Sequence, residues 1–496
     1  MDNSYILRLE SAVFKARPAL GEILLDKTHK NLINYAHTYP KSFHKTENNR
    51  KKQLISVIHQ ESARLFGDYV AQSISEQLFQ NYFVSTADHH GPLVHPFFVQ
   101  SNLLAGHMQE QTGQENLLVL ACGNVSLNNS SYPRGLLFHY RNNFGEICEY
   151  KLPFFPSSDR LRPVFSQRSF NNSDIARVKA KLYKDLKLDV PKDLYEKVNE
   201  LLNNIYNNEK IFEQKNFADQ ISLTNSRLWN NFFPHSQPNL PKLLYLQLEE
   251  IVINLLLAYH LQDSTEIFNF LFNPEIRTSV IEQFDEIPGG FSKTIKTGTF
   301  LFWAMPPGKK YRERLWPQGD KLISDSGLYQ LDLSPESVRK ALLNRELIPS
   351  IMFSLVILSA YHGLKCLGGF SQVQYLRKIH ESYSQIFGIA EALPEHSKTL
   401  CGDMLFAFLE EKSKPYSFIP ATGVDLIIHS NNCSWENFLK NLKSLTLREA
   451  LIPMLPELYR ILYPAGKAEA DLASLSHHQM LNASGIGRKI TAVGNI

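Results

Sequence analysis

The stretch Tyr82-Phe83-Val84-Ser85-Thr86-Ala87-Asp88-His89-His90-Gly91-Pro92-Leu93-Val94-His95-Pro96 decides how the rest of the chain is interpreted. A short run with β character leads into it, and Gly91 and Pro92 break the backbone directly after the paired histidines. One carboxylate and three imidazoles fall within the eight positions 88–95. Such groups are costly to bury unless they are paired. The stretch therefore predicts a metal-binding or proton-transfer site at the end of a strand.

The composition is that of a globular protein with large apolar cores. The chain has 496 residues, of which 43% are hydrophobic, 20% are charged and 11% are aromatic. This length exceeds what a single core usually organises, so two or three subdomains are expected. The formal net charge of +3 gives no long-range basic field, and no nucleic-acid partner is expected.

The cysteines and the N-terminus indicate a cellular compartment. Five cysteines are widely spaced and never form a Cys-x-x-Cys motif: Cys122, Cys148, Cys366, Cys401 and Cys433. This pattern disfavours a disulfide framework or a structural zinc ribbon and favours a reducing compartment. No basic region followed by an apolar region begins the chain, so no secretory signal is expected, and the cytoplasm is the predicted location.

Two apolar runs need testing as membrane spans. The run 243–261 carries Glu249 and Glu250 in its middle, and two carboxylates at mid-bilayer would cost about 5 kcal/mol or more. The run 347–361 is shorter than the roughly 17 residues of a spanning helix, and it contains Pro349. Both runs predict buried helices, and no membrane partner is expected.

Strand-like runs follow a helical N-terminal region. Residues 82–85, 117–122, 136–140 and 147–154 have β character, and a helix is expected at 97–111 between the first two. The order strand, helix, strand predicts a parallel pair. The later strands are close enough in sequence to predict an antiparallel hairpin.

Further strands are expected at 299–305 and 424–429. We expect 76–170 and 285–330 to contribute strands to one sheet, because both contain buried β-like runs flanked by helical segments.

The fold class that follows is α/β or α+β, with a central mixed sheet surrounded by many helices and with helical N- and C-terminal regions. Five regions are expected along the chain: a helical N-terminal region (1–75), an α/β core segment with the candidate site (76–175), a mainly helical region (176–284), a second sheet segment (285–333) and a mainly helical C-terminal region (334–496).

The histidine stretch has three interpretations. Neutral imidazoles and a carboxylate suit zinc, iron or manganese, and Asp88, His90 and His95 are the candidate ligands. Alternatively, Asp88, His89 and His90 perform acid–base catalysis or bind substrate without a metal, or the histidines only hold the loop through hydrogen bonds. Neighbouring side chains of an extended segment point oppositely, so His89 and His90 reach one ion only if the backbone turns. The spacing matches no specific motif such as HExxH.

Residues 121–135 follow a hydrophobic strand, where α/β proteins place ligand-binding loops. Three Asn, three Ser, a Tyr and an Arg supply hydrogen-bonding groups there. Arg134 is the candidate clamp for a carboxylate or phosphate, and Asn124, Asn128 and Asn129 are candidate substrate-binding residues. The alternative is a polar turn that satisfies its own backbone.

Residues 288–299 combine glycines, hydroxyls and two lysines that could hold an anion, although a hairpin with solvated lysines fits them better. Four basic residues after the next strand could add positive charge: Lys309, Lys310, Arg312 and Arg314.

Weaker signals come from single residues. Cys122 is a candidate nucleophile, although a buried structural cysteine is commoner. His362 and Gln372 are candidate substrate-binding residues, because they flank Gly368-Gly369, where the backbone permits close approach of a ligand. For His362, a core position satisfied by a partner is the favoured alternative.

These features predict an intracellular enzyme acting on a small polar, anionic molecule by metal-assisted hydrolysis or group transfer. One alternative is a metal-independent acid–base enzyme, a lyase or transferase that uses the same histidines. The other alternative is a non-catalytic interaction protein with a structural histidine loop. A closed polar pocket would favour an enzyme, whereas large exposed apolar patches would favour an interaction protein.

Overall fold

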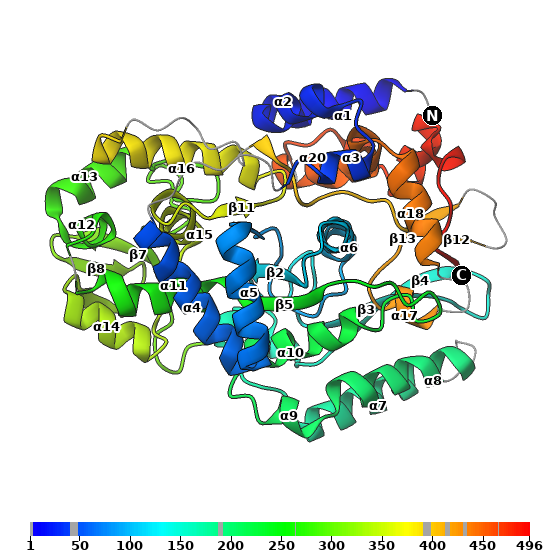
Figure 1. Cartoon of the computed structure of the whole chain (residues 1–496), viewed down its shortest axis with the longest axis horizontal. Coiled ribbons are helices and arrows are strands. Elements are labelled where there is room, and N and C mark those ends of the chain that lie inside the picture. The colour runs from blue at the N-terminus through cyan, green and yellow to red at the C-terminus, as the bar shows by residue number, and fades with distance from the viewer. Residues whose placement is uncertain are drawn as a thin grey trace.

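A four-stranded parallel sheet lies in the middle of the protein (Figure 1). The computed structural model describes residues 3–39, 48–186, 192–262, 264–389, 398–411, 417–429, 434–464 and 466–496. The sheet has the order β11-β1-β2-β5 and is formed by β11 (Lys365–Leu367), β1 (Phe83–Ser85), β2 (Asn116–Ala121) and β5 (Lys242–Gln247). Each neighbouring pair in this sheet is parallel, so the carboxyl ends of its strands meet at one edge.

Helices cover both faces of this sheet, which explains the continuous apolar runs of its strands. α4 (Asn48–Phe66) and α5 (Asp68–Gln80) contact it, and so do α6 (Pro96–Gln111) and α10 (Phe217–Trp229). Successive residues of β2 belong alternately to two separate apolar cores, because neighbouring side chains of a strand point to opposite faces. One core includes residues of α4 and α5, and the other includes residues of α6 and α10.

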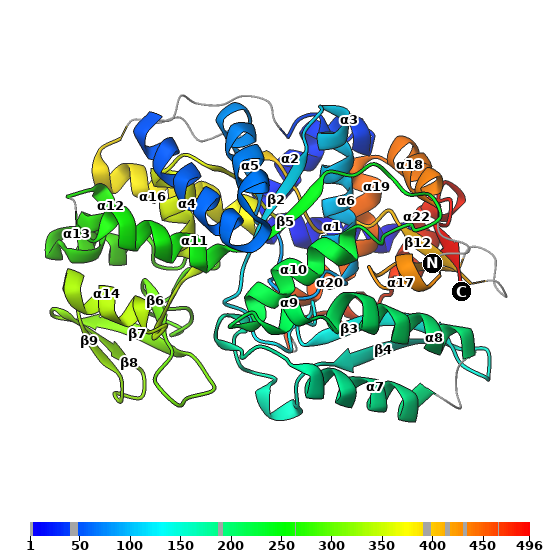
Figure 2. The same cartoon turned by 60° about the horizontal axis from the view of Figure 1, so that its bottom comes forward.

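A five-stranded antiparallel sheet forms a separate layer in the same molecule (Figure 2). Its order is β10-β6-β7-β8-β9, from β10 (Leu347–Pro349), β6 (Phe302–Ala304), β7 (Glu313–Gln318), β8 (Lys321–Ser324) and β9 (Gln330–Asp332). Helix α14 (Pro335–Leu343) packs against it. This helix begins after Ser334, whose side chain accepts a hydrogen bond from the Ser337 amide.

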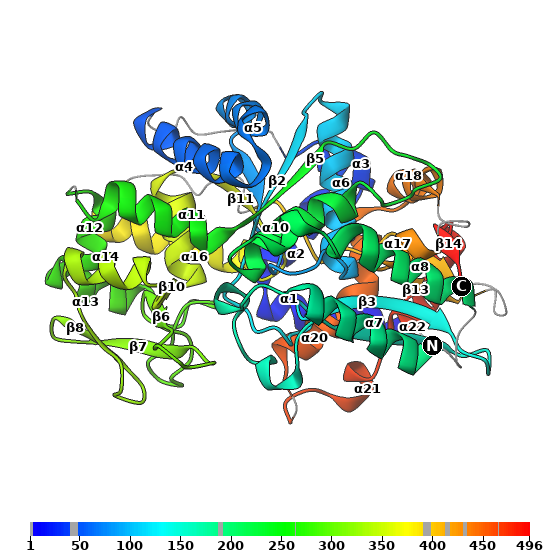
Figure 3. The same ribbon diagram turned by 90° about the horizontal axis from the view of Figure 1, so that it is seen from below.

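Two smaller sheets lie at the other end of the molecule (Figure 1). β3 (Gly135–Arg141) and β4 (Ile147–Pro153) form an antiparallel hairpin. β13 (Phe418–Pro420), β12 (Phe408–Glu410) and β14 (Gly494–Asn495) form a three-stranded sheet in that order. The two chain termini lie at this same end (Figure 3).

The other elements surround these sheets. Further α-helices are α1 (Ser4–Ala16), α2 (Pro18–Lys27), α3 (Leu32–Ala36), α7 (Asn172–Leu186), α8 (Lys192–Leu201), α9 (Glu209–Phe212), α11 (Leu248–Leu255), α12 (Glu266–Phe272), α13 (Pro274–Gln283), α15 (Ile351–Leu355), α16 (Gln372–Phe387), α17 (Asp425–Ile428), α18 (Trp435–Ser444), α19 (Leu447–Leu451), α20 (Leu455–Leu462), α21 (Ala470–Ala473) and α22 (His477–Ser484). Short 3-10 and π turns are η1 (Ser157–Asp159), η2 (Val164–Ser166), η3 (Leu202–Tyr206), η4 (Leu256–His260), η5 (Val356–Tyr361), η7 (Ile452–Met454) and η8 (Ile486–Arg488). None of the helices in the described part of the chain has both the length and the apolarity needed to cross a bilayer.

The α/β or α+β class is confirmed, with several sheets among many helices. The parallel pair is confirmed as β1 and β2, and the hairpin as β3 and β4. The prediction that 76–170 and 285–330 share one sheet is wrong, because their strands lie in different sheets. The other partners of β1 and β2 come instead from 242–247 and 365–367, and no local pattern marks such distant pairing.

Two apolar runs are not the single buried helices that we expected. The run 243–261 divides between β5, α11 and η4, and the run 347–361 divides between β10, α15 and η5. A continuous apolar run lacks the period that separates a buried strand from a buried helix.

The strand expected at 424–429 is also wrong. The segment contains the helix α17, which begins where the Thr422 hydroxyl accepts a hydrogen bond from the Asp425 amide at 3.0 Å.

Candidate functional site

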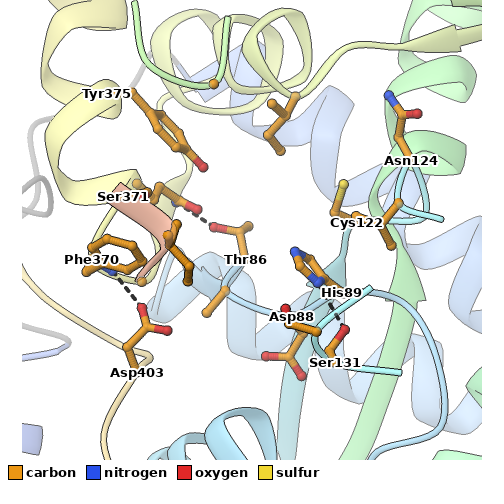
Figure 4. Close-up of a pocket in the computed structure, with 18 of the residues that line it drawn as sticks. Thr86, Asp88, His89, Cys122, Asn124, Ser131, Phe370, Ser371, Tyr375 and Asp403 are labelled. Atoms are coloured by element: carbon orange, nitrogen blue, oxygen red, sulfur yellow. Dashed lines mark hydrogen bonds between the residues drawn. The ribbon is translucent and has the colours of Figure 1, made fainter. Parts of the chain in front are cut away.

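A cavity of about 660 Å³ opens at the carboxyl ends of the parallel strands (Figure 4). Loops that follow β1, β2 and β11 line it, and they contribute Asp88, Asn124 and Ser371 among others. The residues that precede β6 and β7 also line it, including Gly290 and Arg312. This edge of a parallel sheet is where α/β proteins bind ligands. The volume is in the range of small-molecule sites.

The histidine stretch is held at this edge by backbone hydrogen bonds to the end of β2. The Cys122 amide donates to the carbonyl of Asp88, and the His90 amide donates to the carbonyl of Cys122, both at 2.8 Å. These bonds keep residues 88–90 extended, so consecutive side chains point in different directions. Asp88 and His89 line the cavity, whereas His90 does not.

The carboxyl group of Asp88 is buried in the wall of the cavity, with 1% of the residue exposed. Its Oδ2 accepts a hydrogen bond from the amide of Asn102 at 2.7 Å, and its Oδ1 has no hydrogen-bond partner among the described residues. Burial raises the pKa of Asp88 to about 7, against the opposite effect of Asn102 and of the Tyr245 hydroxyl. Asp88 is therefore present both with and without its proton near neutral pH.

His89 is oriented by a chain of hydrogen bonds from the loop that follows β2. Its Nδ1 lies 3.0 Å from the hydroxyl of Ser131, which donates its proton to Oδ1 of Asn129 at 2.6 Å. The orientation of the Asn129 amide is fixed in turn, because its Nδ2 donates to the carbonyl of Ser126 at 3.0 Å. The Ser131 hydroxyl has only one proton, so His89 must donate from Nδ1.

The Nε2 of His89 then carries the lone pair. It has no hydrogen bond to the described residues, and the ring projects into the cavity (Figure 4). Burial lowers the pKa of His89 to about 4, so the ring is neutral at pH 7. His89 thus offers a hydrogen-bond acceptor to a ligand.

The two other histidines of the stretch have different surroundings. The His90 ring is fully buried and its Nε2 lies 2.9 Å from the carbonyl of Ala218. His95 precedes the first residue of α6 and lines the cavity, with its ring centroid 4.3 Å from that of Phe97. Burial lowers the pKa of His90 to about 4 and that of His95 to about 3.

The candidate metal ligands do not gather around one point. Asp88 and His95 line the cavity, but His90 points toward α10. Within the described ranges, no three His, Cys, Asp or Glu side chains are grouped closely enough to hold a metal ion. We therefore assign no metal step to this site.

A buried carboxylate shapes the loop that follows β2. Glu249, in the first turn of α11, accepts hydrogen bonds from the amides of Gly123 at 2.8 Å and Asn124 at 2.9 Å. The Cys122 thiol donates to the same carboxylate at 3.3 Å, and burial raises the pKa of this thiol. The candidate nucleophile is thus held as a thiol, which is the unreactive form.

Arg312 supplies positive charge to the cavity from the segment that precedes β7. Its Nη1 donates to both the carbonyl and the side-chain oxygen of Asn124, and its guanidinium lies 4.2 Å from the centroid of the Trp303 ring. Its Nε and Nη2 make no hydrogen bond to the described residues. Arg312 is the only lysine or arginine among the residues that line this cavity in the described part of the chain.

Several predicted substrate-binding residues lie outside the cavity lining. Arg134 does not reach it, because its Nε donates to the carbonyl of Phe155 at 2.9 Å and its Nη2 to the hydroxyl of Ser157 at 3.2 Å. The prediction that Arg134 shares the pocket of the histidines is wrong. Asn128 is exposed at the surface, and Asn129 lies outside the lining, where it accepts a hydrogen bond from the Ser131 hydroxyl.

Of the two other predicted substrate-binding residues, one lines the cavity and one does not. Gln372 lines the cavity and donates to the Thr86 hydroxyl at 2.7 Å. His362 lies in the core, where its Nε2 is 3.2 Å from the Nε2 of His260 and its Nδ1 is 2.8 Å from the carbonyl of Arg50. These two partners satisfy His362 without a ligand, which matches the favoured alternative.

Two carboxylic acids in the lining were not predicted from the sequence. Asp403 adopts a left-handed conformation with φ of 60°, which is uncommon for a residue other than glycine. Its Oδ2 accepts a hydrogen bond from the Phe370 amide at 2.7 Å, and burial raises its pKa to about 6. Burial also raises the pKa of Glu457, at the start of α20. Only the dipeptide Gly402-Asp403 marks a turn in the sequence, and nothing marks Glu457.

The sequence matches no protein-family model, and no curated protein is significantly similar to it. The cavity combines a carboxylic acid that titrates near neutral pH, a neutral histidine with an accessible lone pair, and one arginine. This set can exchange protons with a bound molecule and hold an anionic group of that molecule.

Proposed function

We propose that the protein is an enzyme that converts a small polar molecule by general acid–base chemistry, as a lyase or a group-transfer enzyme. The observation that carries this proposal is the arrangement of Asp88 and His89 in the wall of one cavity of about 660 Å³. Perturbed pKa values inside a concave pocket are typical of catalytic sites.

The two residues have different roles in the proposal. His89 Nε2 accepts a hydrogen bond from a hydroxyl or amino group of the substrate, because the Ser131 contact leaves the lone pair on that nitrogen. Asp88 exchanges the proton, because a pKa of about 7 matches the pH at which the reaction has to run. In its ionised form it removes a proton from the substrate, and in its neutral form it returns one.

The substrate class follows from the other charged groups. Arg312 would hold an anionic group through its Nε and Nη2, and Trp303 supports the plane of the guanidinium. Asp403 and Glu457 line the same cavity and would accept hydrogen bonds from hydroxyl or amino groups. We therefore propose a substrate with an anionic group and with hydroxyl or amino groups on the remainder of the molecule.

We further propose that this reaction takes place in the cytoplasm. The four described cysteines are free thiols, which supports a reducing compartment: Cys122, Cys148, Cys366 and Cys401. Cys433 lies outside the described residues.

The proposal is tested by comparing a mixture of metabolites before and after incubation with the protein, because this experiment does not require the substrate to be known. Wild-type protein, Asp88→Asn and His89→Gln are incubated with a mixture of polar metabolites, which is then compared by mass spectrometry. We expect the wild type to deplete a compound that carries an anionic group. Both variants should deplete it at least about a hundredfold more slowly, since a general acid or base typically contributes that factor or more. His29→Gln is the control, because His29 is exposed and lies outside the cavity lining.

Three results would contradict the proposal. Equal depletion by the wild type and both variants would remove Asp88 and His89 from the chemistry. No depletion of any compound by folded wild-type protein would favour the interaction protein over an enzyme. One equivalent of zinc, iron or manganese in the wild type, lost in Asp88→Asn, would restore the metal-assisted reaction in place of the proposed one.

A further inference from the structure

A second, smaller cavity of about 360 Å³ lies on the antiparallel sheet, away from the residues of the candidate site. Alternate residues of β7, including Arg314 and Trp316, form one side of it, since side chains two apart in a strand share a face. Lys293 and Lys296, from the loop before β6, lie at its edge together with Asp325. None of the residues that line this cavity lines the larger one.

Arg314 is the unusual residue of this cavity. It is only 8% exposed, and its Nε is buried without a hydrogen-bond partner. Its side chain forms no ion pair or hydrogen bond with the described residues, and its guanidinium lies 5.0 Å from the centroid of the Trp316 ring. A buried guanidinium without an anionic partner is costly, because its hydration is lost and nothing replaces it. The position is therefore suited to an anion from outside the chain.

The two lysines add to this positive charge. Both are exposed, and both lie in a tight turn in which the Ser292 amide donates to the carbonyl of Thr297 at 2.9 Å. Lys296 adopts a left-handed conformation with φ of 51°, a strained arrangement that persists only when its surroundings hold it. With Arg314 they provide three positive charges among the lining residues, against the carboxylate of Asp325 in the lining and that of Asp285, which accepts a hydrogen bond from the Lys293 amide at 2.9 Å.

We propose that this cavity binds the phosphate group of a small phosphate ester. The excess of positive charge suits a phosphate monoester, which carries about −1.5 to −2 at pH 7. The planar guanidinium can donate two parallel hydrogen bonds to phosphate oxygens, and the lysine ammonium groups add point charges. The cavity is larger than a phosphate group alone, and Trp316 offers an apolar surface to the organic part of the ester. The proposal does not depend on the reaction proposed for the larger cavity.

Calorimetric titration of the full-length protein with inorganic phosphate and with glycerol phosphate tests this proposal. We expect both compounds to bind the wild type, and the double variant Lys293→Ala/Lys296→Ala to weaken both by about tenfold or more, which corresponds to roughly 1.4 kcal/mol. These lysines are exposed, so the double variant is expected to fold. Lys309→Ala is the matched control, because Lys309 is exposed in the same region but lines neither cavity.

Two further variants separate this cavity from the larger one. Arg314→Gln should weaken phosphate binding at least as much as the lysine double variant does, by about tenfold or more, whereas Arg312→Gln reports phosphate that binds in the larger cavity. Loss of binding in Arg312→Gln with retention in the lysine double variant would assign the phosphate to the larger cavity and overturn the proposal. Failure of the wild type to bind either compound would overturn it as well. Binding of acetate in preference to phosphate would show a carboxylate site instead.

Discussion

The hydroxyl of Ser131 lies 3.0 Å from Nδ1 of His89 and joins the loop after β1 to the loop after β2. This contact determines which nitrogen of the histidine faces the cavity as an acceptor. A residue of the loop after β2 thus sets which hydrogen-bonding group His89 presents to the cavity. The Asn-rich, Ser-rich loop at 121–135 positions the histidine, and only some of its polar groups face the cavity.

Replacing Ser131 by Ala should remove the contact that fixes His89 in one tautomer. The hydroxyl that accepts the Nδ1 proton is lost, so we expect ¹⁵N NMR to show Nδ1-protonated His89 in the wild type and a mixture of tautomers in Ser131→Ala. The loss of one neutral hydrogen bond should lower the free energy of unfolding by only about 1 kcal/mol. Ser130→Ala is the control, because Ser130 lines the cavity but does not bond to His89. The same tautomer in wild type and Ser131→Ala would contradict the assigned chain of hydrogen bonds.

Asp88 should make the protein less stable as the pH rises. Its pKa is about 7 in the folded state against the ordinary value of 3.8, so between these values the folded state binds a proton that the unfolded state has lost. Stability contributed by this group therefore falls as the pH increases toward 7, by on the order of 4 kcal/mol in all. Below pH 3.8 both states are protonated and the effect disappears.

Asp88→Asn should remove this dependence, because the amide cannot ionise. In urea titrations, the stability of the variant relative to the wild type should increase by about 3 kcal/mol between pH 5 and pH 8. Asp403→Asn is a matched comparison: its pKa of about 6 predicts a smaller increase, of about 1 kcal/mol, over the same interval. A relative stability of Asp88→Asn that does not change with pH would show that Asp88 has an ordinary pKa.

Individual helices and strands were predictable where the sequence shows a hydrophobic period or residues that break the backbone. The helix at α6 and the strands β1 to β4 are marked by Gly, Pro and Asn clusters at their ends. The sheets themselves were not predictable, because β1 pairs with β11, which is nearly three hundred positions away by the register Phe83↔Lys365. Such pairing depends on tertiary packing and leaves no trace in a local window.

The site was predictable in part for the same reason. Asp88 and His89 are ionisable residues that directly follow a strand, so the local sequence is enough to predict their place in the cavity. The sequence position of Arg134 predicts a place in the same cavity, but its side chain donates to the carbonyl of Phe155 instead. Asp403 and Glu457 enter the cavity from segments more than three hundred residues after Asp88, and only the fold brings them together.

Glu249 should matter more to stability than its neighbour Glu250. Each oxygen of the Glu249 carboxylate accepts a backbone amide, and Glu249→Gln leaves only one oxygen for two donors. A buried amide without an acceptor costs about 1–3 kcal/mol, which urea denaturation can measure. Glu250→Gln breaks a half-exposed ion pair with Arg345 at 2.9 Å and should cost about 1 kcal/mol or less. Equal effects of the two substitutions would remove Glu249 from its role in holding the β2 loop.

Arg312 connects the segment before β7 to the loop after β2, and Lys310 connects the same segment to η1, after β4. Arg312 donates to Asn124 from a partly buried position, whereas Lys310 pairs with Asp159 at 2.9 Å with 43% of its side chain exposed. Hydrogen bonds to a buried charged group are worth about 1.5–3 kcal/mol, and an exposed ion pair about 0–1 kcal/mol.

Arg312→Ala should therefore open the cavity wall locally, while Lys310→Ala should not. In hydrogen–deuterium exchange, we expect the backbone amides of Gly123 and Asn124 to exchange about tenfold faster or more in Arg312→Ala, because local opening becomes easier by at least about 1.4 kcal/mol. In Lys310→Ala the same amides should change by less than about a factor of five. If Arg312→Ala leaves the exchange of these amides unchanged, Glu249 alone holds the loop. All the N–H groups of Arg312 could then bind a ligand.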